Sequence, residues 1–220
     1  MPREKLSDKI VRAGKCVKLL KKSYPEVDCT LGYKTVHQLM VATILSAQCT
    51  DERVNIVTPG LFRKYPSIED FAQADLKKLA RDIRSTGFYN NKAKAIKLSA
   101  QQILERHNGK VPHTLNELTK LTGVGRKTGS VILGTGFGLA EGIVVDTHVF
   151  RISRKLGFTV KKDVVKVERD LMKIISKEDW IIYSHLMIFH GRRICKARKP
   201  ECAKCFLSSM CPSSVNRVNA

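Results

Sequence analysis

The sequence lacks long apolar runs, and it has half as many acidic as basic residues. No stretch reaches the roughly 18 consecutive apolar residues that a membrane-spanning helix needs. The N-terminal segment MPREKLSDKIVRAGK has no apolar core of the kind found in a secretory signal. Its Glu4 and Asp8 are also untypical of a transit peptide. We therefore expect a cytoplasmic protein without a membrane partner.

Acidic residues are scarce: 20 Asp and Glu stand against 40 Lys and Arg, which gives a formal net charge of +20. An excess of this size favours a polyanionic partner, and nucleic acid before a membrane surface. The basic residues are spread along the chain and are not gathered in one tail, so we assign the charge to a folded surface. A surface that is basic only for solubility is the alternative.

The cysteines are seven, an odd number in a chain without a recognisable secretory signal, which argues against a disulfide framework. Three are scattered: Cys16, Cys29 and Cys49. The other four gather near the C-terminus with the spacing C-x6-C-x2-C-x5-C: Cys195, Cys202, Cys205 and Cys211. Four thiolates in one short loop predict a metal site with sulfur ligands, either zinc or an iron–sulfur cluster.

Alternation of apolar and polar residues, the mark of a half-buried strand, is missing, whereas apolar residues recur at helical spacing. The sequence therefore predicts an all-α fold. Among the helices expected are those at residues 51–63, 75–84, 91–107, 126–137, 147–156, 164–175 and 179–193. Ser67 and Thr114 are expected N-caps, the second in a capping box with Glu117.

The segment LTGVGRKTG (residues 121–129) joins two expected helices within about 114–137, and its first five residues (121–125) are called the hairpin. Gly123 and Gly125, one residue apart, permit a tight turn that leaves backbone N–H groups open at a helix N-terminus, where they can bind phosphate. We therefore expect a helix–hairpin–helix motif that grips the DNA backbone without reading its sequence. The expected contacts are Gly123, Val124, Gly125, Arg126 and Thr128. A plain glycine turn between two helices is the alternative.

Lys127 lies in the first turn of the expected helix after the hairpin, where the positive end of the helix dipole disfavours an ammonium. A nucleophilic amine at that position also needs desolvation and a base. Asp146 can supply the base, since residues 138–145 are long enough for the chain to double back and bring two helix N-termini together. A simple N-cap is the alternative for Asp146, and both roles can coexist.

The loop that contains the four cysteines (residues 195–211, the cluster loop) is basic between the first two of them. Lys196, Arg198 and Lys199 lie in this interval. A loop that is held in shape by a bound metal and carries these charges is a second expected phosphate-binding surface. A merely soluble loop is the alternative.

Five segments together resemble the endonuclease III family of the helix–hairpin–helix DNA glycosylase superfamily. They are LSAQ with TD (45–48 and 50–51), GFYNNKA (87–93), LTGVGRKT (121–128), VDTHVFR (145–151) and the four-cysteine loop. The resemblance covers nearly the whole chain. It implies a [4Fe–4S] cluster and two helical domains: a six-helix barrel at residues 30–140, and a cluster domain made of residues 1–29 and 141–220.

The resemblance also implies an activity: DNA glycosylase and abasic-site lyase of base excision repair, acting on double-stranded DNA with damaged pyrimidines or abasic sites. The damaged base flips into a groove between the domains. Lys127 matches the family's Schiff-base lysine and Asp146 its essential aspartate. Gln48 matches a residue that fills the space left by the flipped base. Phe88 aligns where the family often has an aliphatic wedge residue, and a core position is the alternative for it.

Two other functions remain open from the sequence. An adenine-specific mismatch glycosylase shares the fold and the cluster, but that family typically lacks the lysine and carries a further C-terminal domain. A non-catalytic, metal-stapled DNA-binding protein is the other alternative, and Lys127 with Asp146 argues against it. We expect a monomer that is associated with the nucleoid in a bacterial or archaeal cytoplasm.

Overall fold

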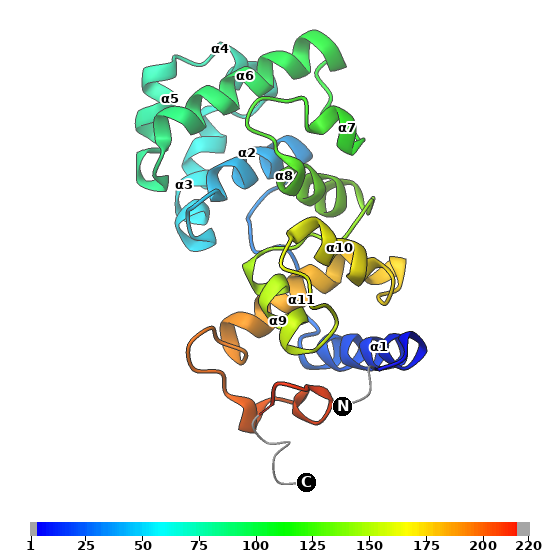
Figure 1. Ribbon diagram of the computed structural model, residues 1–220. Helices are drawn as coiled ribbons and strands as arrows, with labels where there is room; N and C mark the ends of the chain where they lie inside the picture. The colour runs from blue at the N-terminus through cyan, green and yellow to red at the C-terminus, as the bar shows by residue number, and fades with distance from the viewer. Residues whose placement is uncertain (1–3, 215–220) are drawn as a thin grey trace. The chain divides into compact units, whose positions relative to one another are not determined.

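The computed structural model describes residues 4–214, and every regular element in this range is a helix (Figure 1). The α-helices are α1 (Leu6–Ser23), α2 (Val36–Ser46), α3 (Asp51–Lys64), α4 (Ile68–Gln73), α5 (Leu76–Asp82), α6 (Tyr89–His107), α7 (Leu115–Leu118), α8 (Arg126–Val131), α9 (Thr147–Lys155), α10 (Val164–Met172) and α11 (Trp180–Arg193). Short 3₁₀ turns are η1 (Arg84–Thr86), η3 (Lys177–Asp179), η4 (Cys202–Lys204) and η5 (Ser208–Met210), and η2 (Ile132–Gly136) is a π-helix. The predicted all-α fold is confirmed. No described helix is long and apolar enough to cross a membrane.

Ser67 and Thr114 are N-caps as expected, but the complete capping box lies at Ser67 and not at Thr114. Ser67 accepts a hydrogen bond from the backbone N–H of Asp70, and the Asp70 carboxylate accepts one from the Ser67 N–H, so the box lies here. Thr114 caps α7 through the N–H of Glu117 at 3.3 Å. The Glu117 carboxylate, however, accepts from the Thr114 hydroxyl at 2.7 Å, a side-chain bond instead of the expected return bond to the backbone.

The chain folds into two compact units, each with its own internal contacts. One unit runs from Cys29 to Glu141. The other joins the residues before Cys29 to those from Gly142 onward. The expected domain boundaries remain a proposal, because a division by contacts does not test what each unit does.

The unit from Cys29 to Glu141 is organised around α6, the long helix beside α4 and α5 in Figure 1. Helix α2 also contacts α6, and its middle residues are buried on every side. The buried face of α6 presents Ile96, Ala100 and Ile103 to the core. After the hairpin, α8 continues directly into η2, so the predicted helix at 126–137 is one helical segment with a π-turn at its end.

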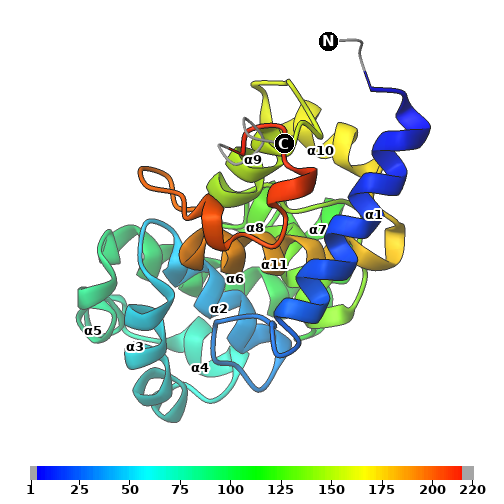
Figure 2. The same cartoon turned by 90° about the horizontal axis from the view of Figure 1, so that it is seen from below.

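The other unit contains α1, α9, α10 and α11, and Tyr183 of α11 lies at the centre of its core with no exposed surface. The C-terminal segment, red in Figure 2, lies beside α1. Arg12 of α1 holds it there by donating to the carbonyl of Met210 at 3.0 Å and to that of Leu156 at 2.7 Å. Side-chain donation to two carbonyls from distant segments thus helps to fix a part of the chain that has little regular structure.

The turn at Gly123 gives a stability prediction. Gly123 has φ = +81°, and a Cβ atom there would lie 2.5 Å from the Cβ of Ala95 in α6. We expect Gly123→Ala to lower the free energy of unfolding by about 2 kcal/mol or more, since left-handed strain and overpacking add. Gly60 is the matched control: it lies inside α3 with no atom near the added Cβ. Gly60→Ala should stabilise by about 0.5–1 kcal/mol. Equal melting temperatures for the two variants would contradict this reading.

Candidate functional site

The hairpin is anchored on α6 at two points. Gly123 approaches Ala95, and the backbone N–H of Thr122 donates to the Gln102 side chain at 2.8 Å. Gly125 is the N-cap residue of α8, and no side chain caps that helix. The first N–H groups of a helix have no partner within it, so the start of α8 presents donors at an exposed turn.

One expected hairpin contact is corrected by the structure. Val124 is only 3% exposed, and its backbone N–H donates to the carbonyl of Leu121 at 3.1 Å. The side chain therefore belongs to the core, and the N–H is already used inside the turn. Gly123, Gly125 and Arg126 are exposed, and Thr128 is half-buried. The exposed part of this segment thus lies at Gly123 and at the start of α8 and not along the whole turn.

Lys127 is the second residue of α8, and it is exposed. Because it follows the hairpin directly, its position is determined by the same contacts with α6 that fix the turn. A flexible side chain on a fixed backbone can carry an amine to an atom of a bound ligand. Lys127 belongs to the unit from Cys29 to Glu141.

Asp146 is the N-cap of α9, as expected: its Oδ1 accepts a hydrogen bond from the Val149 N–H at 2.8 Å. It follows a segment in which Ile143 and Val145 are buried, and it is itself half-buried. Asp146 belongs to the unit that starts again at Gly142. The expectation that it meets Lys127 at one site stays a prediction.

Among the described residues, three exposed side chains lie on left-handed backbone. Gln48 has φ = 52° and Phe88 has φ = 46°, and Asn108, at the C-cap of α6, is the other described non-glycine residue with positive φ. Such a conformation costs roughly 1–2 kcal/mol for a residue with a Cβ. Phe88 is 62% exposed, so the alternative that placed it in the core is wrong. Strain that coincides with exposure is frequent at binding sites.

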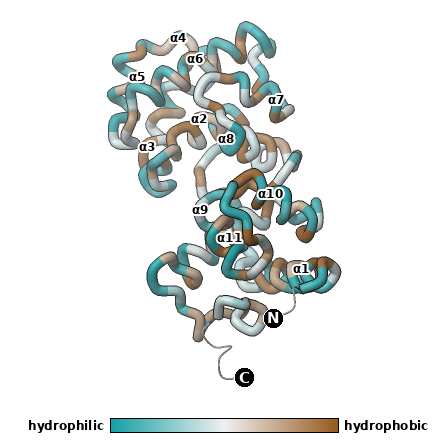
Figure 3. The backbone as a smooth tube through the Cα atoms, viewed as in Figure 1, coloured by the Kyte–Doolittle hydropathy of each residue, from teal (hydrophilic) through white to brown (hydrophobic). Residues whose placement is uncertain are grey.

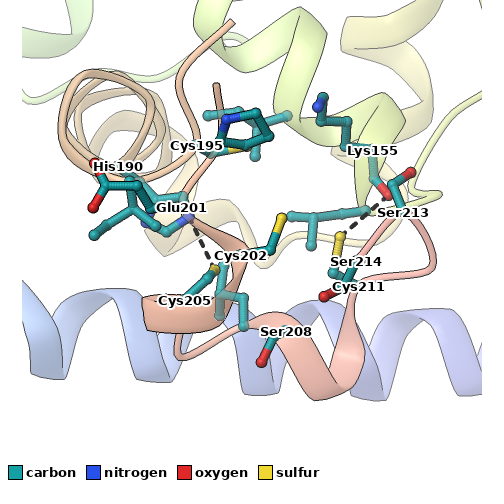
Figure 4. A pocket seen from close by; sticks show the side chains of 15 residues that line it. Lys155, His190, Cys195, Glu201, Cys202, Cys205, Ser208, Cys211, Ser213 and Ser214 are labelled. Carbon is teal, nitrogen blue, oxygen red and sulfur yellow. Dashed lines mark hydrogen bonds between the residues drawn. The ribbon is translucent and has the colours of Figure 1, made fainter. Parts of the chain in front are cut away.

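The four cysteines of the cluster loop line one open cavity of about 440 Å³, mouth included (Figure 4). Four thiols that line one cavity form a ligand set of sulfur atoms only, and such a set fits an iron–sulfur cluster or a zinc ion.

Polar contacts to the cysteines come from α9 and α11. The buried His190 ring lies 3.6 Å from the Cys205 Sγ through Nε2 and 3.0 Å from the Tyr24 hydroxyl through Nδ1 (Figure 4). Arg151 donates to the Cys195 carbonyl at 2.8 Å. Burial lowers the pKa of His190 to about 4, so its ring is neutral at pH 7. Burial raises the pKa of the Cys205 thiol, which therefore needs a metal to displace its proton.

The basic residues of the cluster loop are exposed, and the loop that follows α11 is correspondingly teal in Figure 3. Lys196 pairs with Glu201 at 2.6 Å, and Lys204 approaches the same carboxylate at 3.3 Å. These two contacts lower the pKa of Glu201. Lys196 thus has part of its charge balanced within the loop, whereas Arg198 and Lys199 extend the exposed positive surface.

Sequence reasoning missed Lys92 and His190. Lys92 is only 6% exposed, and its Nζ donates to two backbone carbonyls, those of Leu45 at 2.8 Å and Thr86 at 2.7 Å. A signal was present: Lys92 falls on the same helical face as the apolar Ile96 and Ile103, where a lysine is unusual. His190 had no comparable signal in the sequence, because what makes it notable is its contact with Cys205, 15 residues later in the chain.

Comparisons with known proteins agree with this geometry. Residues 41–177 match the model of the HhH-GPD superfamily of base excision DNA repair proteins, and residues 195–211 match the iron–sulfur binding domain of endonuclease III. The fold and the cysteine cavity thus define a base-excision DNA-repair protein with an iron–sulfur domain.

Similar curated proteins are endonuclease III from a Synechocystis species, 49% identical over 96% of each chain, and from Bacillus subtilis, 45% identical over 92% of each. Similar solved structures are a non-covalent endonuclease III–DNA complex, which covers 96% of this chain and 99% of that one, and a trapped endonuclease III–DNA covalent intermediate, covering 95% and 98%. Both have a TM-score of 0.88 and 43% identity.

The chain belongs to the endonuclease III family. It is accordingly a DNA glycosylase and abasic-site lyase of base excision repair, and it carries a [4Fe–4S] cluster. The zinc alternative is set aside by the match of residues 195–211 to the iron–sulfur binding domain of endonuclease III.

The contact between His190 and Cys205 predicts an effect on the cluster. Removing a hydrogen-bond donor from a ligand sulfur changes the reduction potential of a cluster and exposes it to loss. We expect His190→Phe to shift the midpoint potential to more negative values and to speed bleaching of the cluster's visible absorbance in air. Tyr24→Phe, which removes only the partner of the ring's other nitrogen, should give a smaller shift in the same direction. An unchanged potential in His190→Phe would show that the contact has no influence.

Proposed function

We propose that this enzyme removes oxidised pyrimidines from double-stranded DNA and cuts the strand at the same site through a Schiff base on Lys127. The observation that carries the proposal is the exposed Lys127 in the first turn of α8, directly after the hairpin, at an exposed helix N-terminus of the kind that suits a phosphate. DNA is the partner of this family's solved complexes, and a covalent intermediate among them supports a covalent route.

In the proposed reaction, the neutral amine of Lys127 attacks C1′ of the damaged nucleotide, and the glycosidic bond breaks as the base leaves with its electron pair. Loss of a proton from nitrogen gives an aminal at C1′. The bond between C1′ and the ring oxygen O4′ then breaks, O4′ takes up a proton, and the opened sugar carries the protonated imine. Removal of a C2′ proton then breaks the bond between C3′ and its oxygen, so the strand is cut on the 3′ side of the lesion. The product imine hydrolyses and returns the lysine.

The role proposed for Asp146 is that of a base. A carboxylate close to a lysine stabilises its ammonium, so proximity alone would hold Lys127 in the unreactive form. Asp146 must therefore accept a proton, directly or through water, or stabilise positive charge that develops on the sugar. The Asp146 carboxylate is held in place because its Oδ1 accepts the capping bond from the Val149 N–H. A carboxylate has further lone pairs, so it can still accept a proton.

DNA binding is proposed for three exposed surfaces. The start of α8, with Gly123, Gly125, Arg126 and Thr128, would hold a phosphate through backbone and side-chain donors. Gln48 and Phe88 would fill the space that a flipped nucleotide leaves in the stack; an aromatic ring suits this role by stacking.

The cluster loop would contribute the third surface, through Lys196, Arg198 and Lys199. Its cysteines Cys195, Cys202, Cys205 and Cys211 are the proposed ligands of the cluster. The cluster would supply the folding energy of a loop that buries little apolar surface. The enzyme is proposed to act as a monomer, and the bacterial relatives support a bacterial host.

The nucleophile is tested by borohydride trapping on a duplex that contains one thymine glycol. We expect a covalent protein–DNA adduct with the wild type and none with Lys127→Ala, because only a reducible imine is trapped. Lys120, an exposed lysine just before the hairpin, is the matched control, and Lys120→Ala should still form the adduct. No adduct in the wild type, with duplex binding intact, would refute the lyase route for this lesion. An adenine mispair and an abasic site would then be tested in turn.

The role of Asp146 is tested by Asp146→Asn. Asparagine caps a helix as well as aspartate does, so the melting temperature should not change. The single-turnover excision rate should fall by about 10²–10⁴-fold, because the amide accepts no proton at neutral pH. A rate close to that of the wild type would leave Asp146 with its capping role alone.

A further inference from the structure

Lys92 connects two of the exposed left-handed residues of the unit from Cys29 to Glu141, Gln48 and Phe88. Its ammonium donates to the carbonyl of Leu45, three residues before Gln48, and to that of Thr86, two residues before Phe88. Its backbone N–H donates to the carbonyl of Phe88 itself at 3.0 Å. One residue at the start of α6 thus holds the two segments from which Gln48 and Phe88 project.

The chemistry of these contacts suits a lysine. An ammonium has three donors that can point at oxygens from separate segments. Leu45 lies in the last turn of α2, where backbone carbonyls lack partners within the helix and the dipole favours a cation. An apolar residue of similar length would fill the space but would leave both carbonyls without this donor.

Keeping a charge here has a cost. Lys92 is only 6% exposed, and burial lowers its pKa. A buried ammonium that only packed against the core would be easily replaced by methionine or leucine. The two carbonyls that Lys92 binds lie shortly before Gln48 and Phe88 in the chain. This placement points to a role in holding those two strained residues.

We propose that Lys92 is a positioning residue: it holds the backbone before Gln48 and Phe88 so that both side chains are ordered before DNA arrives. The inference rests on the proposed insertion of these two side chains into DNA. Without the two hydrogen bonds of Lys92, both segments would have to become ordered during DNA binding, and the entropy cost of that ordering would weaken the complex. Lys92 acts through Gln48 and Phe88 and does not touch the reacting atoms.

The test is a double-mutant cycle on duplex binding. The probe is a duplex with a tetrahydrofuran abasic analogue, which cannot be cleaved by elimination, and fluorescence anisotropy gives Kd. We expect Lys92→Met to weaken Kd about tenfold in the parent enzyme but less than about twofold in the Gln48→Ala/Phe88→Ala background. Equal fold-changes in both backgrounds would overturn the proposal, because a general structural defect does not depend on those side chains.

Lys97 supplies the matched control. It lies on the same helix and donates to a backbone carbonyl, that of Ala74, also at 2.8 Å, but the bonded segment carries no exposed strained residue. Lys97→Met should leave Kd within about twofold in both backgrounds. A tenfold weakening of Kd in Lys97→Met would show that any lysine on α6 that binds a backbone carbonyl has the same effect. The specific role of Lys92 would then be contradicted.

Two further measurements keep the outcome decisive. If Lys92→Met does not fold, Lys92→Gln, whose amide can donate to one of the two carbonyls, should show about a threefold loss with the same dependence on background. If neither variant folds, Lys92 is a structural residue and the inference is wrong. Borohydride trapping by the wild type is measured first, so a failure of the proposed function is seen independently.

Discussion

One face of α6 holds the parts of its unit that are proposed to meet DNA. Lys92 binds the carbonyls that precede Gln48 and Phe88, and three residues later Ala95 leaves just enough room for the glycine turn of the hairpin. Two turns further on, Gln102 accepts from the hairpin backbone. The spacing of these three positions is that of a helix face. A shift of α6 would therefore move the turn before Lys127 together with Gln48 and Phe88.

The other unit fixes its functional parts by different means. Its cluster loop contains only short 3₁₀ turns, so hydrogen bonds from regular elements replace a core of its own. Arg12 of α1, Arg151 of α9 and His190 of α11 each contact the loop or its cysteines. Three helices thus position four thiols around one cavity, and the cluster completes the arrangement. Both units have an apolar core of their own, and the cluster loop is attached to the core of this unit through Leu207.

Much of the fold could be predicted because its signals are local. Helical periodicity, the N-cap at Asp146 and the glycine turn after Leu121 depend on residues a few positions apart, and each is confirmed. The cysteine spacing likewise indicated a metal loop, and family membership identified the cluster. The capping box is incomplete at Thr114, because the Glu117 carboxylate accepts from the Thr114 hydroxyl and not from the Thr114 backbone N–H.

The remaining features depend on contacts between distant segments, which local patterns do not encode. Val124 follows one glycine and precedes another, yet the turn directs it into the core. The exposure of Phe88 depends on a left-handed backbone that hydrophobicity does not predict. The helical face of Lys92 could indicate its burial, but its two partners, 47 and 6 residues away, could not be predicted from the sequence. The meeting of Lys127 with Asp146 and the domain boundaries stay predictions.

The most direct measurement is peptide mapping of the borohydride-reduced adduct. The wild-type enzyme is trapped on a duplex with one thymine glycol, the DNA and the protein are digested, and mass spectrometry locates the sugar remnant. The proposed mechanism predicts the remnant on Lys127, in a peptide from the start of α8. A remnant on any other amine would mean that the exposed lysine beside the hairpin is not the nucleophile, and the proposed chemistry would be wrong.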